Sequence, residues 1–163
     1  MDYGMIGKIE KAKRYAEERH RITIKSLTVD FKGNNNGYRV TLDDSGWHCT
    51  CPGFGSHHIC PHTMALEKLL RPMLKRDPLS YGPGQNVVSD VEKAKRYSEE
   101  TDRIRFVAFE VTFDGNNNGH SFGYDAGRWH CDCDFFRSRH VCSHTMAMER
   151  ILGPMLAPTL VLE

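Results

Sequence analysis

The sequence Trp47-His48-Cys49-Thr50-Cys51, followed by Cys60-Pro61-His62, occurs a second time as Trp129-His130-Cys131-Asp132-Cys133, followed by Cys142-Ser143-His144. Each phrase reads Cys-x-Cys-x8-Cys-x-His, and all six cysteines fall within the two phrases. Three thiolates and one imidazole are a complete ligand set for a closed tetrahedral zinc site. We therefore predict two structural Zn2+ ions, bound by two sets of four residues: Cys49, Cys51, Cys60 and His62, and Cys131, Cys133, Cys142 and His144.

This ligand set has two alternatives. A disulfide framework would leave one cysteine per repeat unpaired, and the two cysteines of a Cys-x-Cys phrase are awkward partners. The fourth ligand has rivals, because two other histidines also recur in both copies. His62 and His144 are favoured, since a helix start fixes each of them beside a cysteine, whereas the rivals are expected outside the metal site: His48, His130, His58 and His140.

The zinc phrases belong to a longer tandem repeat. At a fixed offset of 82 residues, 9–74 aligns with 91–156 without a gap, and 35 of the 66 positions are identical. Between the copies lies a stretch rich in Pro and Gly, which cannot continue a helix. We predict a first repeat at 1–76, a linker at 77–88 and a second repeat at 89–163.

The pattern within each copy predicts an α+β fold of two tandem, small, zinc-stabilised domains. A helix at about 8–19 or 90–101 comes first, then a small antiparallel sheet, the zinc loop and a C-terminal helix. Pro61 suits the first position of that last helix, which would put Cys60 at its cap and His62 in its first turn.

The apolar pattern predicts two details of the sheet. In the first strand of each copy the alternation slips by one residue, between Ile24 and Leu27 and between Phe106 and Phe109, which indicates a β-bulge. The Gly-Asn-Asn-Asn-Gly sequence that follows predicts a tight turn rather than a ligand-binding loop.

The two phrases Cys49-x-Cys51…Cys60-x-His62 and Cys131-x-Cys133…Cys142-x-His144, with the His-Thr-Met-Ala sequence at the end of each, resemble the SWIM-type zinc finger. The resemblance implies a compact ββα metal core and gives the ligand role to these eight residues. Such fingers occur in remodelling ATPases, transposases and ubiquitin-pathway proteins, where they bind DNA or other proteins. The 163 residues contain only the two fingers, so we expect no attached ATPase, transposase or ligase domain.

Composition limits the function further. The chain has 39% hydrophobic residues and no apolar run near the ~20 residues of a membrane span, so we expect no membrane association. Free thiols are typical of a reducing compartment, which favours a cytoplasmic location. Four protein ligands leave no open position for water on the metal, and no other catalytic motif is evident, so we expect neither an enzyme nor a small-molecule substrate.

Two kinds of partner are about equally favoured. Nucleic acid, with DNA preferred over RNA, would contact basic residues on the opening helices and first strand: Lys11, Lys13, Arg14, Arg21, Lys25, Lys93, Lys95 and Arg96. The alternative is a protein-interaction or self-assembly module. Residues 1–82 carry 13 Lys and Arg against 9 Asp and Glu, a balance of +4, while 83–163 carry 9 against 12, a balance of −3. Such halves suit a head-to-tail homo-oligomer.

Overall fold

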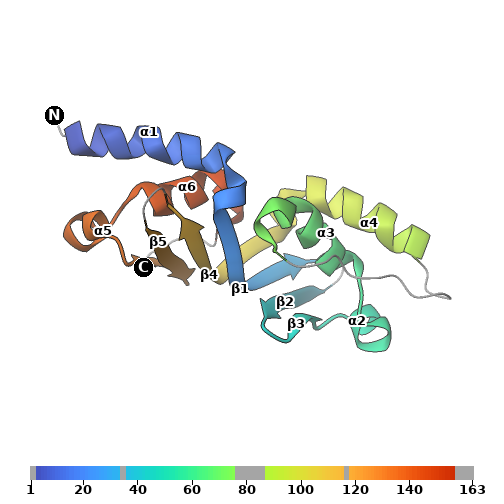
Figure 1. Cartoon of the computed structure of the whole chain (residues 1–163). Coiled ribbons are helices and arrows are strands. Elements are labelled where there is room, and N and C mark those ends of the chain that lie inside the picture. Colours follow the sequence, from blue (N-terminus) through green and yellow to red (C-terminus); the bar gives the residue numbers. More distant parts are fainter. Residues whose placement is uncertain (1–2, 34–35, 76–86, 116–117, 157–163) are drawn as a thin grey trace, which may run out of the picture.

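The computed structural model describes residues 3–33, 36–75, 87–115 and 118–156. It confirms the α+β class: the four longer helices lie on one side of a six-stranded antiparallel sheet, and two short helices lie beside its edge strands (Figure 1). The strands are β1 Ile22–Lys32, β2 Gly37–Asp43, β3 Gly46–Cys49, β4 Ile104–Asp114, β5 Gly119–Asp125 and β6 Arg128–Cys131. The helices are α1 Tyr3–Glu17, α2 Pro52–His57, α3 Pro61–Leu70, α4 Val87–Glu99, α5 Asp134–Arg139 and α6 Ser143–Leu152, with 3-10 turns η1 Arg19–Arg21, η2 Arg71–Met73, η3 Thr101–Arg103 and η4 Gly153–Met155.

One sheet contains the strands of both repeats, in the order β3-β2-β1-β4-β5-β6. Its central pair, β1 with β4, joins the repeats. Ile22 pairs with Phe113 and Phe31 pairs with Ile104, while Leu27 pairs with Phe109, its own counterpart at the offset of 82. A pseudo-twofold axis therefore runs through the Leu27–Phe109 pair. The bounds 1–76 and 89–163 therefore separate two repeats in the sequence. They do not separate two sheets in space, because both repeats contribute strands to the same sheet.

The predicted β-bulge lies in the central pair. The β1–β4 register shifts between Ile24 and Ser26, and again between Thr28 and Val29. A bulge lets both sides of the slip keep their apolar residues on one face. The buried side chains of β1 are accordingly Ile22, Ile24, Leu27, Val29 and Phe31.

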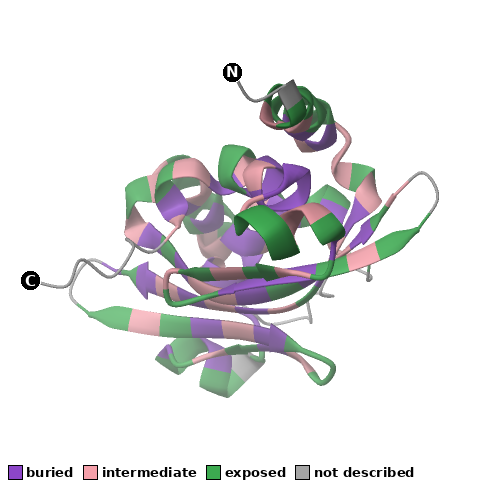
Figure 2. Ribbon diagram, turned by 90° about the vertical axis from the view of Figure 1, so that its left-hand side faces the viewer, coloured by how far each residue is buried: buried purple, intermediate pink, exposed green. Residues whose placement is uncertain are grey.

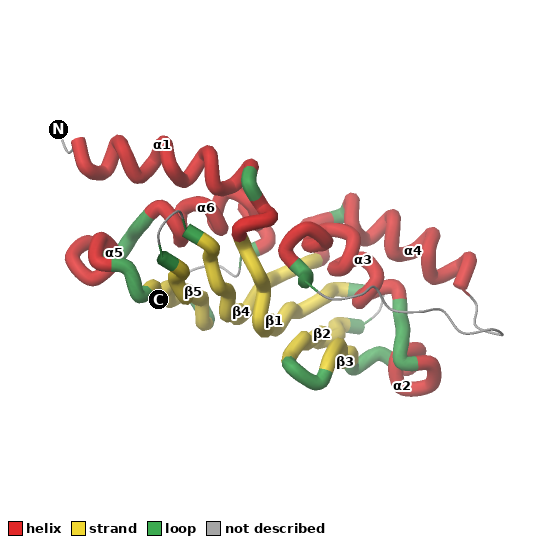
Figure 3. Tube along the Cα trace, viewed as in Figure 1, coloured by secondary structure: helices red, strands yellow, loops and turns green. Residues whose placement is uncertain are grey.

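The two opening helices are exchanged between the repeats. α1, from the first repeat, packs against α6 of the second, and α4, from the second repeat, packs against α3 of the first (Figure 3). Ala12 and Tyr15 of α1 are buried in this contact, as are Ala94 and Tyr97 of α4. Buried residues gather between the helices and the sheet, whereas α1 leaves most of its surface exposed (Figure 2).

Some boundaries differ from those expected. α1 begins at Tyr3 and α4 at Val87, so both start earlier, and α4 includes the last two residues of the expected linker. The rest of that linker, from Asp77 to residue 86, lies outside the described residues. α2 and α5 occupy the stretch between the second and third cysteine of each phrase, where the sequence predicts a loop. No described helix is long and apolar enough to span a membrane.

Candidate metal centres

Each metal centre is assembled at the end of an edge strand. Cys49 is the last residue of β3, Cys51 precedes α2, Cys60 caps α3, and His62 lies in the first turn of α3. The Thr63 N–H donates to Cys60 Sγ at 3.4 Å, and Pro61 occupies the first helical position, as predicted. The second centre repeats this arrangement at the end of β6 and the start of α6.

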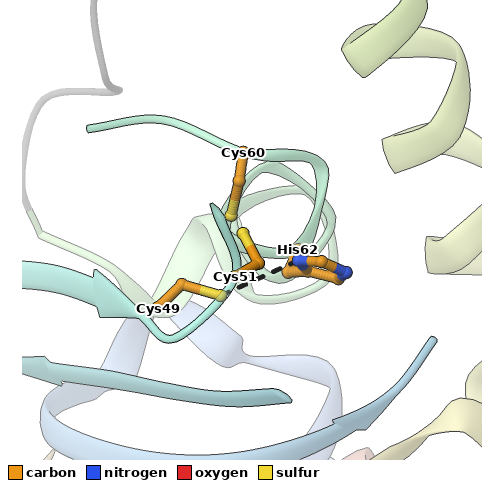
Figure 4. Close-up of side chains that lie close together, drawn as sticks. All are labelled: Cys49, Cys51, Cys60 and His62. Carbon is orange, nitrogen blue, oxygen red and sulfur yellow. Dashed lines mark hydrogen bonds between the residues drawn. The ribbon is translucent and has the colours of Figure 1, made fainter. Parts of the chain in front are cut away.

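The four ligand atoms of each centre converge on one point. In the first centre the ligand atoms of Cys49, Cys51, Cys60 and His62 all lie within 4.8 Å of one another (Figure 4). The same holds for the four ligand atoms of the second repeat. Cys49 Sγ is 3.7 Å from His62 Nδ1. In a tetrahedral zinc site, bonds of about 2.3 Å to sulfur and 2.0–2.1 Å to nitrogen separate the two ligand atoms by about 3.6 Å.

The second centre has the same spacing. His144 Nδ1 lies 3.6 Å from Cys131 Sγ and 3.7 Å from Cys142 Sγ. All six cysteines are free thiols, so the disulfide alternative does not apply. The two Cys3His sets therefore fit two structural zinc ions, with His62 and His144 as the fourth ligands.

In the metal-free first cluster, hydrogen bonds from the Cys49 and Cys60 thiols hold the pKa of Cys51 far below its ordinary value. Hydrogen bonding to Cys51 raises the pKa of Cys49 to about 11, and hydrogen bonding to Cys49 and Cys51 raises the pKa of Cys60 further. Cys51 is therefore the first of the three thiols to lose its proton, while Cys49 and Cys60 keep theirs.

The second cluster distributes its protons differently. A hydrogen bond from Cys131 lowers the pKa of Cys142 to about 3 and raises that of Cys131, while burial raises the pKa of Cys133. The first thiolate therefore lies at Cys142 in this cluster, where hydrogen bonds from the Cys131 thiol, His144 and the Thr145 N–H stabilise it. In both clusters zinc has two thiol protons to displace.

The other recurring histidines lie outside the metal sites. His48 Nε2 is 2.9 Å from Ser45 Oγ, and His130 Nε2 is 2.8 Å from Glu110 Oε1, both on exposed side chains. His58 and His140 adopt left-handed backbone conformations, each with φ of 60°, and end α2 and α5. Their recurrence in both copies reflects helix termination.

The ligand histidine of each centre packs against a tyrosine from the other repeat. Tyr97 stacks on His62 with ring centroids 5.6 Å apart and an interplanar angle of 3°. Tyr15 stacks on His144 at 6.0 Å and 6°. Each centre is therefore enclosed by both repeats. In the sequence, each tyrosine belongs to the apolar stripe of an opening helix and recurs in both copies. The sequence does not indicate which finger each tyrosine contacts.

The basic residues singled out from the sequence fall into two groups. Arg21 and Lys25 lie outside the two opening helices. Arg21 forms an ion pair with Glu18 at 2.7 Å and donates a hydrogen bond to the Asp114 carbonyl at 3.1 Å. Lys25 is exposed on β1. The other six lie exposed on α1 and α4 at equivalent positions: Lys11, Lys13, Arg14, Lys93, Lys95 and Arg96.

The family comparison agrees with this geometry. The family model of the SWIM zinc finger matches the chain twice, over residues 38–70 and 109–152, and each match contains all four ligands of one centre. The chain thus contains two SWIM zinc fingers, whose Cys3His sets fit two structural zinc ions. No curated protein and no solved structure matches it.

Proposed function

We propose that this chain is a non-enzymatic module that binds nucleic acid through α1 and α4. The observation that carries the proposal is the pair of equivalent basic sets on these helices, Lys11, Lys13 and Arg14, and Lys93, Lys95 and Arg96. Within the described part of the chain, the four lysines and Arg14 form no ion pair, whereas Arg96 lies 3.9 Å from Glu100. Unpaired surface cations are what phosphate contacts require.

The pseudo-twofold arrangement favours duplex DNA over RNA. Two equivalent helices related by a twofold axis suit the twofold symmetry of a duplex, and DNA is favoured because its major groove admits an α-helix whereas that of an RNA duplex is too deep and narrow. The closed Cys3His centres support a structural role for zinc, since four protein ligands leave no coordination position for substrate or water. Loaded with two zinc ions the chain has a formal charge of −1, because each centre changes the +1 of the metal-free chain by −1. Binding would thus depend on local positive patches.

The proposal is tested by fluorescence anisotropy with duplex DNA and duplex RNA over a range of salt concentrations. The variants K13Q/R14Q and K95Q/R96Q should each weaken DNA binding and reduce the slope of log K against log salt by roughly 0.9 for every phosphate that the variant no longer neutralises. K25Q is the matched control, because Lys25 is exposed but lies on β1. Equal weakening in all three variants, or a shallow slope for the wild type, would contradict the proposal.

A protein-interaction role is a second candidate, supported by a different observation. The exposed large hydrophobic side chains in the described part of the chain are Ile6, Ile9, Val88 and Val91, with exposed fractions of 42%, 39%, 73% and 43%. They occupy equivalent positions on α1 and α4. Sedimentation velocity tests self-association: a mass that rises with concentration in the wild type but stays monomeric in I6S/I9S would favour assembly over nucleic-acid binding.

A further inference from the structure

A polar cleft of about 290 Å³ opens beside the second zinc centre. α1 of the first repeat contributes Lys8, Lys11 and Tyr15 to its walls, and the first turn of α6 contributes Ser143 and His144. The remaining lining comes from the β4–β5 hairpin, the start of α5 and two further ligands of the zinc centre, Cys133 and Cys142. The cleft thus exists only because α1 is exchanged onto the other finger.

His144 supplies a hydrogen-bond donor that lacks an acceptor. Its Nδ1 faces the sulfurs of Cys131 and Cys142, so the ring proton of the zinc-bound histidine is on Nε2. Zinc-ligand histidines almost always donate this second N–H to a carboxylate, carbonyl or water. His144 is only 7% exposed, and no acceptor for Nε2 lies within hydrogen-bond distance among the described residues.

Ser143 is a second polar side chain of the cleft wall that forms no hydrogen bond with a described residue. It is the first residue of α6, a helix of 10 residues, and it is 4% exposed. Its hydroxyl makes no hydrogen bond within the described part of the chain. A helix of this length also directs backbone N–H groups and the positive end of its dipole at its N-terminus. Ser143 and His144 therefore both offer donors to the cleft.

The charge balance of the cleft favours an anion. Lys8 and Lys11 bring two positive charges, and neither forms an ion pair with a described residue; Lys8 Nζ lies 5.1 Å from the Phe135 ring centroid. The zinc centre contributes a negative charge, because its three thiolates and one Zn2+ sum to −1. Asp134 also lines the cleft, but its side chain is 99% exposed and lies 3.5 Å from Arg137, so water and that cation screen it.

We propose that this cleft binds a phosphate group, and that its occupant is a backbone phosphate of the nucleic acid whose binding is proposed above. A phosphate offers the several acceptor oxygens that the Lys8, Lys11, Ser143 and His144 donors require. The identity of the occupant rests on the proposed function, whereas the affinity for phosphate rests on the cleft alone.

The first centre provides an internal comparison. At the offset of 82 residues, Lys8 corresponds to Asp90 and Ser143 to Pro61. A carboxylate thus replaces a lysine, and a residue without hydroxyl or N–H replaces the serine. The equivalent positions around the first centre therefore lack two of the features that favour an anion, and phosphate is assigned to the second centre only.

The test is a titration of the zinc-loaded full chain with inorganic phosphate, followed by 1H–15N NMR, with sodium chloride at matched ionic strength as the control. We expect saturable shifts of the His144 amide and its Nε2–H, with none at His62. K8D and S143P introduce the residues of the first repeat at these positions, and each should weaken phosphate binding by about tenfold or more. Pro61 already occupies the first position of α3, so S143P is compatible with the helix.

The outcomes separate the site from the function. Shifts that do not saturate, or that are the same in K8D and S143P as in the wild type, overturn the phosphate site even where DNA binding persists. Saturable phosphate binding in a chain that shows no DNA affinity overturns the nucleic-acid occupant and leaves free phosphate as the ligand. Duplex DNA that shifts the same His144 signals, and that binds K8D more weakly, supports the full proposal.

Discussion

A zinc-ligand imidazole binds well only when its ring is held with the ligating nitrogen aimed at the metal. In this chain that support comes from across the molecule, since Tyr15 and Tyr97 stack almost parallel on His144 and His62. Phe113 adds a contact of 4.9 Å to His144, and Phe31 one of 4.8 Å to His62. Zinc affinity in one finger is therefore set partly by a side chain of the other repeat.

The tyrosine contact gives a crosswise prediction. Y15A should weaken zinc binding at the second centre by about tenfold or more and leave the first centre unchanged, because the removed ring packs on His144 and Phe113 of the second repeat. Y97A should do the reverse. Chelator competition followed by native mass spectrometry gives the stepwise loss of zinc, and NMR of the His62 and His144 amides identifies the centre. Y15F, which keeps the ring, serves as the control; weakening at the first centre in Y15A would refute this account.

Zinc binding should also release protons, because the thiols that are protonated in the metal-free cluster must lose their protons to bind the metal. In the first cluster the pKa of Cys51 is lowered, while that of Cys49 is raised to about 11 and that of Cys60 is raised as well. At pH 7 the metal-free cluster therefore keeps two thiol protons that zinc displaces, so affinity rises with pH and falls in acid. Calorimetry in buffers of different ionisation enthalpy should give about two protons per zinc. Release of none, or of three, would show a different proton distribution.

At the scale of elements, the exchanged helices decide how the fingers depend on each other. α4 packs on α3, whose first turn holds His62, and α1 packs on α6, whose first turn holds His144. Two 3-10 turns reinforce the exchange: Arg21 donates to the Asp114 carbonyl and Arg103 to the Lys32 carbonyl, at 3.1 and 3.0 Å. Loss of one zinc should consequently release a helix of the other repeat.

Hydrogen exchange can detect that release. C60S, which removes a ligand of the first centre, should speed amide exchange in α3 and α4 while α1 stays protected. C142S should expose α6 and α1 and leave α4 protected. Faster exchange confined to the repeat that carries the substitution, α1 and α3 in C60S, would mean that the helices are not coupled to the opposite centre.

The sequence predicts local features of these elements well and their partners poorly. Cys60 as a helix cap, Pro61 in the first turn and the bulge near Ser26 follow from local chemistry, and the structure confirms all three. The exchange of α1 does not follow, because an apolar stripe such as Ala12 and Tyr15 shows that a face is buried without showing what covers it. α2 and α5 escape prediction since six residues are too few for a helical period.

At the scale of the whole molecule, the repeats form one body around a pseudo-twofold axis. The central β1–β4 pairing extends from Ile22 with Phe113 to Phe31 with Ile104. Both exchanged helices and both metal centres are arranged about it.

Cutting the chain between the repeats tests this organisation. A protease site placed within 77–86 of the full chain should be cleaved without separating the halves, because the central strands and both exchanged helices still hold them. Native mass spectrometry should then show one complex with both fragments and two zinc ions. Two separate fragments, each with its own zinc, would show that the repeats fold independently.

The Leu27–Phe109 pair on the axis has an evolutionary consequence. In a dimer of identical chains, a residue on the twofold axis always meets its own copy, so every substitution there changes both partners at once. Fusion of two copies into one polypeptide removes that restriction, and here a leucine faces a phenylalanine, both buried. The same freedom allows Lys8 and Ser143 to differ from Asp90 and Pro61, so that the surroundings of the two metal centres are chemically different.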